Sequence, residues 1–496
     1  MPYVKRFKFF AFILPLYFFT RLVNFLIIPI FTDEAIYSYW AQVALHDPAN
    51  RFISLEDGKQ PLFIWFAAFS QKFIADPLIA TRIVSVFAGL GTTLGIYLLA
   101  KELLSERVAR ISALLYIVLP FALLYDRLAL FDSLLTMFCV WAILFSVKMA
   151  KNPRLDLALL NGITLGLGLI TKSSAIFFLY LLPFSLLLFD FKKVQFIRRL
   201  TKWASLSFIT VVLAQVIYNS LRVSPLFYMI DRKNHEFIRT FSEVAKNPLQ
   251  HFSGNFDSMI TWSIQYNGPL IILALLPVAI GFIKKEKKII LLSIYILAPF
   301  FITAVFNKVL YPRFALFYFP VVIILIAYGA VYLLDLFTKR RSVIWLLLLF
   351  LIAYPLFSSL KLLTDPPGAN IASADKNQYL NDWPAGSGVS PVVDILKKQT
   401  AHQKVYVGTE GTFGLLPFAL QIYFYGNPNI EIVGYWPVGD IPKQTLESAK
   451  TKKTFFVFNE NQKESPVPDT SSLKLIGKFQ KGSGNSFMRL YEVVPR

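Results

Sequence analysis

The chain is poor in cysteine, histidine and charge. Its 496 residues include one cysteine, Cys139, within an apolar stretch, so no intramolecular disulfide is possible and any domain outside the cytoplasm must fold without one. The four histidines show no pairing at ligand spacing, so a metal site built from histidine is not expected. Only 16% of the residues are charged, against about a quarter in a soluble globular protein.

Long hydrophobic runs take the place of charge. Hydrophobic residues make up 55% of the chain, and many windows of roughly 18 residues are apolar enough to span a bilayer. The net charge of +20 could suggest nucleic acid. However, Lys and Arg gather in short loops between the apolar runs and form no basic face interleaved with aromatic residues. We therefore expect a multi-spanning α-helical membrane protein surrounded by membrane lipids, with no nucleic acid partner.

The basic loops also predict the topology. Lys5, Arg6 and Lys8 precede the first apolar run without a small-residue cleavage site, which indicates an uncleaved signal anchor with a cytoplasmic N-terminus. The apolar stretch 61–75, about 15 residues, is too short to span and should lie along the outer surface. Spans are predicted near residues 9–31, 82–100, 109–125, 133–150, 157–171, 174–190, 203–221, 264–283, 289–306, 315–336 and 342–360.

If every basic loop lies in the cytoplasm, the chain crosses the plasma membrane about eleven times and its C-terminus lies outside. Residues 1–363 form the predicted transmembrane domain, with a first outer loop at 32–82 and a long one at 222–262. A turn-rich junction follows, and residues 364–496 are expected to form a small extracytoplasmic α/β domain. Its predicted strands are 405–408, 430–433, 454–458 and 487–493, and its predicted helices are 392–399 and 414–425. The domain has no P-loop or dinucleotide fingerprint.

Polar residues cluster at the predicted outer ends of the spans. They are Asp33 and Glu34 after the first span, Lys59, Arg127 with Asp132, Lys172, and Arg313. Cationic side chains can hold phosphate oxygens and stabilise a leaving phosphate, and a carboxylate can take a proton from an attacking hydroxyl. Structural explanations also exist: Asp33-Glu34 could be a solvated helix end, Lys59 a snorkelling lysine, Arg127–Asp132 a loop ion pair and Arg313 a headgroup anchor.

The order of these motifs is informative. The chain reads Thr32-Asp-Glu-Ala35, Gly58-Lys-Gln-Pro-Leu62, Arg127-Leu-Ala-Leu-Phe-Asp132, Gly168-Leu-Ile-Thr-Lys172 and Pro312-Arg-Phe314. In this order the motifs resemble those of the GT-C membrane glycosyltransferases, in the branch of protein O-mannosyltransferases and lipid A aminoarabinose transferases. The resemblance covers roughly residues 1–335 and implies a GT-C-like fold.

The resemblance implies transfer of a hexose or pentose, with inversion, from a polyprenyl-phosphate carrier to a lipid, glycan or protein hydroxyl outside the cytoplasm. By the same resemblance, Asp33 is the general base with Glu34 beside it, and Asp132 is the second acidic position. Lys59 contacts the carrier phosphate, and Arg127, Lys172 and Arg313 match basic positions near the cavity. Two departures exist: Arg313 precedes Phe where Tyr is frequent, and the C-terminal part does not resemble a β-trefoil, which leaves a protein acceptor unsupported.

Other functions are open to this sequence. Acidic residues near a phosphate could recruit a divalent cation, but no ligand set is evident, so no metal ligand is assigned. A lipid or polysaccharide transporter or flippase of the cell envelope is the main alternative. Transporters tend to place polar residues near the bilayer midplane and to repeat their halves, whereas here the polar residues follow span ends. A scaffolding membrane protein would leave those residues unexplained.

Overall fold

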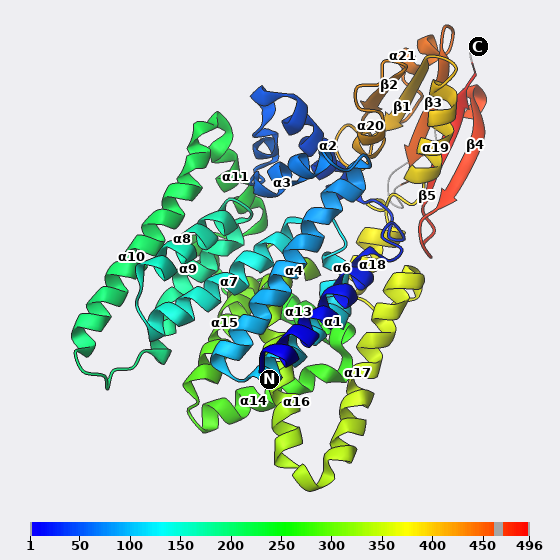
Figure 1. The fold of residues 1–496 in the computed structure, drawn as a ribbon. Helices are drawn as coiled ribbons and strands as arrows, with labels where there is room; N and C mark the ends of the chain where they lie inside the picture. The colour runs from blue at the N-terminus through cyan, green and yellow to red at the C-terminus, as the bar shows by residue number, and fades with distance from the viewer. Residues whose placement is uncertain (1, 461–469, 495–496) are drawn as a thin grey trace.

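The computed structural model describes residues 2–460 and 470–494. The first three quarters of the chain form a helical bundle, and the rest forms a small sheet with helices beside it (Figure 1). The helices of the bundle are α1 (Pro2–Leu22), α2 (Thr32–His46), α3 (Leu62–Gln71), α4 (Pro77–Leu103), α5 (Glu106–Val118), α6 (Pro120–Tyr125), α7 (Phe131–Lys151), α8 (Leu155–Leu169), α9 (Ile176–Leu181), α10 (Phe196–Asn219), α11 (Met229–Phe237), α12 (Phe241–Lys246), α13 (Phe252–Asn267), α14 (Ile272–Ile283), α15 (Lys287–Phe306), α16 (Phe319–Leu336) and α17 (Arg341–Thr364).

Among the described residues, 7 helical stretches are long and apolar enough to cross a membrane, which is the pattern of an integral membrane protein. They are Pro77–Leu103, Phe131–Lys151, Phe196–Val223, Phe252–Ile283, Lys287–Phe306, Pro312–Leu336 and Thr338–Thr364. Each contains a predicted span, but the stretch Phe252–Ile283 begins twelve residues before its predicted span, within the predicted outer loop 222–262. The remaining predicted spans, near 9–31, 109–125, 157–171 and 174–190, also fall on helices, but shorter or interrupted ones. The total of about eleven crossings therefore stays a prediction.

Two of these differences have a local cause. Helix α1 ends at Leu22 rather than near residue 31, because the Arg127 guanidinium binds the carbonyl oxygens that end the helix, as described below. The predicted span 109–125 is divided into α5 and α6 at Pro120, since proline has no N–H to continue the helical ladder. The apolar stretch 61–75 contains helix α3, which has 10 residues and is too short to span a bilayer.

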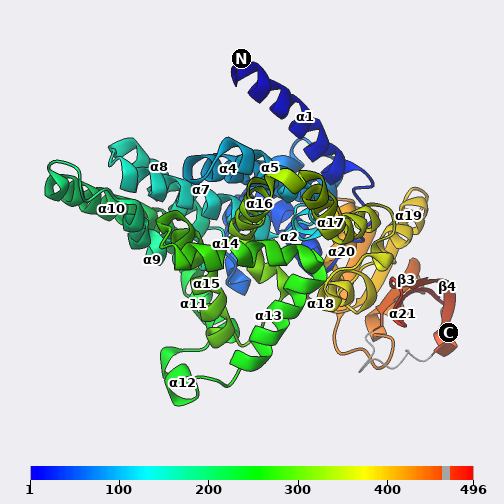
Figure 2. The same ribbon diagram turned by 90° about the horizontal axis from the view of Figure 1, so that it is seen from below.

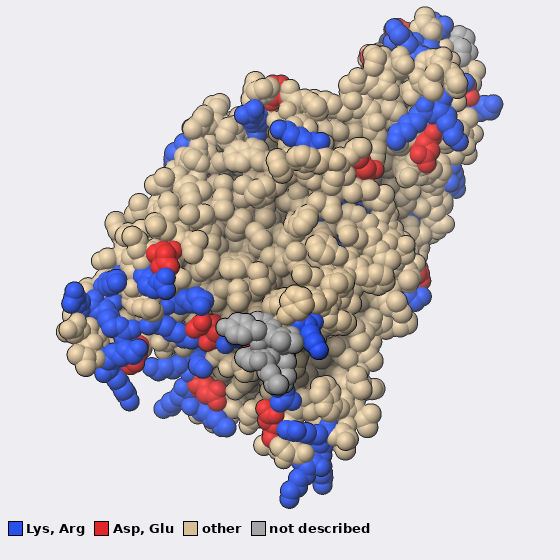
Figure 3. Space-filling view, viewed as in Figure 1, with Lys and Arg blue, Asp and Glu red and all other residues tan. Residues whose placement is uncertain are grey.

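Charge is unevenly distributed over the bundle. In Figure 3, Lys and Arg gather at the lower end, and a broad band of uncharged surface separates them from the opposite end. The N-terminus lies toward the basic end, whereas α2, α3 and the C-terminal sheet lie at the other (Figure 1). Seen from below, α1 lies at the edge of the bundle (Figure 2), where it packs against α4 and α5. An uncharged belt between two polar ends suits a protein embedded in a bilayer.

The C-terminal part is an α/β structure, as the sequence predicts. Its sheet has the order β2-β1-β3-β5-β4, with β1, β2 and β3 parallel and β5 antiparallel to both of its neighbours. The elements are α18 (Ser373–Lys376), α19 (Val389–Thr400), β1 (Val405–Glu410), α20 (Phe418–Phe424), β2 (Ile430–Tyr435), α21 (Lys443–Ser448), β3 (Lys453–Asn459), β4 (Leu473–Gln480) and β5 (Phe487–Val493). The predicted strands and helices are all present, and β4 is an additional edge strand.

The sheet region is joined to the bundle close to Asp33. The Thr32 amide donates to the Pro384 carbonyl at 3.0 Å, and the Gly386 amide donates to the Ile30 carbonyl at 2.8 Å. These bonds make an antiparallel bridge between Phe31 and Ala385. The Tyr39 ring of α2 also stacks on Phe418 of α20, with ring centroids 4.6 Å apart. The start of α2 is therefore held by residues from both parts of the chain.

Candidate active site

Asp33 and Arg313 form an ion pair at the end of the bundle away from the basic loops. Asp33 lies in the first turn of α2, and Arg313 lies in the short 3₁₀ helix Pro312–Tyr318 that leads into α16. The Arg313 Nη1 atom is 2.8 Å from Asp33 Oδ2, with the side chains 10% and 23% exposed. The pair is thus shielded from bulk water but not sealed off. The Arg313 guanidinium also lies over the Tyr311 ring, 5.1 Å from its centroid.

A second ion pair joins Lys172 and Asp132. Lys172 follows α8, and Asp132 lies in the first turn of α7. Lys172 Nζ donates to Asp132 Oδ1 at 2.6 Å and lies 4.3 Å from the centroid of the Phe314 ring, which is next to Arg313 in the chain. Burial lowers the pKa of the Lys172 amine from its ordinary value, an effect that the charge of Asp132 opposes. Asp33 and Asp132 are both close enough to Arg313 for their charges to act on it.

Lys59 lies beside these two pairs. Gly58 precedes it with a left-handed φ of +64°, and a Cβ there would stand 2.4 Å from the Met229 carbonyl oxygen, so this tight turn requires glycine. The turn is tied to the Lys172 segment, because Gln60 donates to Ser173 Oγ at 2.6 Å and the Leu62 amide donates to the Ile170 carbonyl at 3.1 Å. The segment Gly58–Leu62 therefore positions Lys59 through its own tight turn and through its hydrogen bonds to the segment around Lys172.

The ammonium of Lys59 has an unusual environment. Burial lowers its pKa from the ordinary value, while the charges of Asp33 and Asp57 raise it and that of Arg313 lowers it. It lies 5.6 Å from the Phe237 ring centroid, and no carboxylate among the described residues is within ion-pair distance. A half-buried cation without an acidic partner is well suited to bind an anionic ligand.

Glu34 and Arg127, which the sequence also predicts as site residues, lie apart from this cluster. Glu34 is fully buried and accepts two hydrogen bonds of 2.7 Å from Arg82 and one of 2.7 Å from the Ala129 amide. Arg127 donates to the carbonyls of Thr20, Arg21, Val23 and Asn24 at 2.7–3.0 Å. Both side chains hold the backbone around the site, and Arg127 does not pair with Asp132.

The structure adds a residue that sequence reasoning missed. Tyr379 lies in the short helical segment Asn377–Asn381, after the last long helix. Its ring packs edge-on against Phe31, with centroids 4.7 Å apart. Its hydroxyl is close enough to Asp33, Asp132 and Arg313 for their charges to act on it. The hydroxyl is buried and has no hydrogen-bond partner among the described residues. No local sequence signal marks Tyr379, because only the fold brings it to the site.

Asp375 lies in α18, directly before the segment that carries Tyr379. Its carboxyl group is buried between Tyr125, which donates to Oδ2 at 2.5 Å, and Tyr266, which also donates to Oδ2. Burial raises the pKa of Asp375 to about 6, against the opposing effect of the two tyrosine hydroxyls. The residues that the structure describes contain no group of three or more His, Cys, Asp or Glu side chains that could hold a metal ion.

The site thus combines two ion pairs, an unpaired lysine and a tyrosine hydroxyl at one end of the bundle. Asp33, Lys59, Asp132, Lys172 and Arg313 come from well-separated parts of the chain. A cationic group of this kind can hold a phosphate, and the carboxylates can accept a proton from a hydroxyl.

Comparisons with known proteins show which proteins share part of this sequence pattern and the fold. The family model described as dolichyl-phosphate-mannose-protein mannosyltransferase matches residues 58–218, a stretch that includes Lys59, Asp132 and Lys172. A search of curated protein sequences gave no match. Among solved structures, ArnT from Cupriavidus metallidurans in the apo state is 14% identical with a TM-score of 0.57, and the match covers 99% of this chain and 98% of that one.

The oligosaccharyltransferase of Archaeoglobus fulgidus in the apo form is also similar, at 14% identity and a TM-score of 0.55, covering 91% of this chain and 69% of that one. The chain therefore has the fold of the GT-C membrane glycosyltransferases, and the resemblance drawn from its motifs is confirmed. Within that superfamily, residues 58–218 resemble the dolichyl-phosphate-mannose-protein mannosyltransferases.

Proposed function

We propose that the chain is an inverting glycosyltransferase that takes a hexose or pentose from a polyprenyl-phosphate carrier. The observation that carries the proposal is the convergence of Lys59, Lys172 and Arg313 around the carboxylates of Asp33 and Asp132. Proteins of the same fold bind such carriers: ArnT was solved bound to undecaprenyl phosphate, at a TM-score of 0.54, and the Archaeoglobus fulgidus enzyme AglB with a dolichol-phosphate, at a TM-score of 0.53.

The mechanism follows from the residues of the cluster. Lys59, which has no acidic partner, binds the phosphate of the donor, and Arg313 turns from Asp33 toward the same phosphate. Asp33 is then free to accept the proton of the acceptor hydroxyl as its oxygen attacks the anomeric carbon. The bond from that carbon to the phosphate oxygen breaks, and its electron pair stays on the phosphate, where Lys59, Lys172 and Arg313 stabilise the negative charge.

The remaining groups position the site. Asp132 holds Lys172 in place, and Tyr379 directs its unpartnered hydroxyl toward the reacting groups. Glu34 and Arg127 act indirectly through the backbone that they bind. The acceptor is a hydroxyl of a lipid, glycan or protein, and the C-terminal domain, residues 364–496, contributes to its choice because Tyr379 lies in it.

We place the reaction on the extracytoplasmic face of the plasma membrane, with the N-terminus in the cytoplasm. The uneven charge supports this orientation, because cytoplasmic loops retain Lys and Arg and these residues gather at the end opposite the site (Figure 3). The transporter alternative is not favoured, since the site residues lie at the ends of helices, in the first turns of α2 and α7 and in the turns beside α8 and α16, whereas transporters tend to place polar residues near the bilayer midplane.

The direct test is consumption of a labelled polyprenyl-phosphate sugar by the purified full chain. The wild type is expected to release the polyprenyl phosphate, and Asp33→Asn is expected to lose at least 100-fold in rate, about the contribution of a general base. Asp335→Asn is a matched control, because it breaks an exposed pair with Arg107 (2.6 Å) at the basic end. Full activity of Asp33→Asn would refute the proposed base, and no consumption by the wild type with any donor would refute the function.

A further inference from the structure

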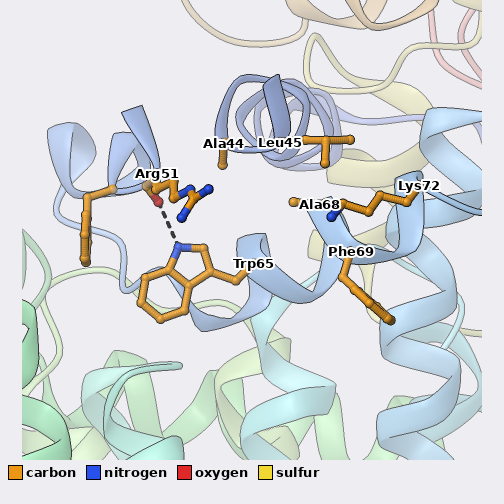
Figure 4. Close-up of a pocket in the computed structure, with 8 residues that line it drawn as sticks. Ala44, Leu45, Arg51, Trp65, Ala68, Phe69 and Lys72 are labelled. Atoms are coloured by element: carbon orange, nitrogen blue, oxygen red, sulfur yellow. Dashed lines mark hydrogen bonds between the residues drawn. The ribbon is translucent and has the colours of Figure 1, made fainter. Parts of the chain in front are cut away.

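A groove lies apart from the candidate active site, between the end of α2, helix α3 and the turns beside α3. It has a volume of about 470 Å³. Small side chains, Ala44 and Ala68, leave room in it, and Trp65 and Phe69 form an aromatic wall (Figure 4). The Trp65 indole N–H donates to the Arg51 carbonyl at 2.8 Å, which fixes the turn after α2 against α3. The size is that of a site for a small molecule or a lipid headgroup.

Two cations occupy this otherwise apolar groove. Arg51 and Lys72 extend toward one another from opposite sides (Figure 4). Neither forms an ion pair with any residue in the ranges 2–460 and 470–494, and no acidic residue lines the groove. Some other exposed or half-exposed cations do have carboxylate partners, for example Lys233 with Asp57 and Lys361 with Asp365. The groove therefore carries an unbalanced positive charge, which complements an anion.

The surface beside the groove is apolar. On and just after α3, Phe66, Phe69 and Phe73 are 42%, 61% and 73% exposed. Aromatic side chains exposed at the end of a membrane bundle contact the region where headgroups meet acyl chains. A ligand that fits both the cations and these rings has a compact anionic head and an apolar tail.

The groove is separate from the reacting groups. Ala44 lies eleven positions after Asp33 on the same helix, which corresponds to roughly 16 Å along its axis. A phosphate held between Arg51 and Lys72 is thus not the phosphate that leaves in the transfer reaction. However, α2 carries Asp33, and α3 begins just after Lys59, so a ligand in the groove contacts both helices that present these residues.

We propose that this groove binds an anionic phospholipid of the membrane, with its phosphate between Arg51 and Lys72 and its acyl chains along Phe69 and Phe73. The proposal does not depend on the transfer reaction. It predicts preference for a lipid with net negative charge, because two cations without acidic partners favour phosphatidylglycerol over zwitterionic phosphatidylcholine, whose ammonium would be repelled.

The test is native mass spectrometry of the full-length protein titrated with either lipid. Wild-type protein is expected to hold phosphatidylglycerol at least tenfold more tightly than phosphatidylcholine. The double variant Arg51→Gln/Lys72→Gln should weaken phosphatidylglycerol roughly tenfold or more, since each cation near a membrane surface contributes on the order of a fivefold factor. Lys443→Gln/Lys450→Gln removes two exposed lysines on and beside α21 and should leave binding unchanged.

A second variant separates the groove from general surface charge. Ala68→Leu narrows the groove without removing a charge and should also weaken phosphatidylglycerol. The proposal is overturned if the charge variant binds phosphatidylglycerol like the wild type, if the control pair weakens it equally, or if Ala68→Leu has no effect. The melting temperature of Arg51→Gln/Lys72→Gln, measured without added lipid, should match the wild type, because both side chains are exposed. Equal loss of both lipids by this variant together with a lowered melting temperature would also count against the site.

Discussion

Glu34 and Arg82 form a buried, two-point ion pair that turns Glu34 away from its neighbour Asp33. Arg82 also donates to the carbonyls of Phe25, Ile28 and Pro29 at 3.0–3.2 Å. The pair therefore holds the loop that leads into α2, and with it the position of Asp33. Adjacent carboxylates in one helical turn have separate roles: one faces the site and the other supports it.

The first prediction compares these two carboxylates. Glu34→Gln should lower the free energy of unfolding by about 3 kcal/mol or more, because it leaves a buried guanidinium without its counter-charge. Asp33→Asn should cost less stability than Glu34→Gln, since its ion pair with Arg313 is partly exposed and the charge of Asp132 also acts on Arg313, but it should slow transfer at least 100-fold. Thermal unfolding in detergent and the donor-consumption assay measure the two effects. If Asp33→Asn proved the less stable variant, the assignment of roles would be reversed.

The second prediction concerns Lys59. Lys59→Ala should raise the KM for the lipid donor roughly tenfold or more, because a charge-assisted hydrogen bond contributes about 1.5–3 kcal/mol. Lys59→Arg keeps the charge and should recover part of the loss. Lys361→Ala is the control, as its ion pair with Asp365 is exposed (3.0 Å). An unchanged KM in Lys59→Ala would remove this lysine from the phosphate site.

The third prediction tests Tyr379. Tyr379→Phe removes a buried hydroxyl that has no protein partner among the described residues, so stability should not fall, because no hydrogen bond within the protein is lost. Transfer should slow roughly tenfold if the hydroxyl contacts donor or acceptor. Tyr125→Phe is the matched control: its hydroxyl donates to Asp375, so this variant should mainly lose stability. If Tyr379→Phe keeps the wild-type kcat and KM, Tyr379 contributes only through the packing of its ring.

The fourth prediction is a dependence of stability on pH. The pKa of Asp375 is about 6 in the fold, above its ordinary value near 4. The folded state therefore keeps a proton that the unfolded chain loses, and stability should fall as pH rises from about 4 to 6. The effect is at most about 3 kcal/mol. Asp375→Asn should flatten this part of the curve when melting temperatures at pH 4.5 and 7 are compared with the wild type; parallel curves would exclude Asp375 as the titrating group.

Much of the fold follows from the pattern of the sequence. Hydrophobic length identifies the helices, and short runs of apolar and β-branched residues identify β1, β2, β3 and β5. Strand β4 escapes this pattern because its register shifts between Leu475 and Gly477, which interrupts the alternation of side chains, and because it lies at the edge of the sheet.

The site was only partly accessible from the sequence. Lys59, Asp132, Lys172 and Arg313 could be predicted to gather because each stands at the end of an apolar segment expected on the same side. Pattern alone cannot separate Asp33 from Glu34, since neighbours on a helix point about 100° apart and the choice depends on Arg82. Nor can it find Tyr379, whose approach to Arg313 depends on the path of the chain after α17.

The bridge between Phe31 and Ala385 has a practical consequence for work on this protein. Cutting the chain after α17 would remove Tyr379 and would leave the Thr32 amide and the Ile30 carbonyl, one or two peptide units from Asp33, without their partners. If such a truncated bundle were inactive, the cause could be a disturbed first turn of α2. The result would therefore not show that residues 364–496 are a separate accessory domain. The bundle and the sheet region should therefore be studied together.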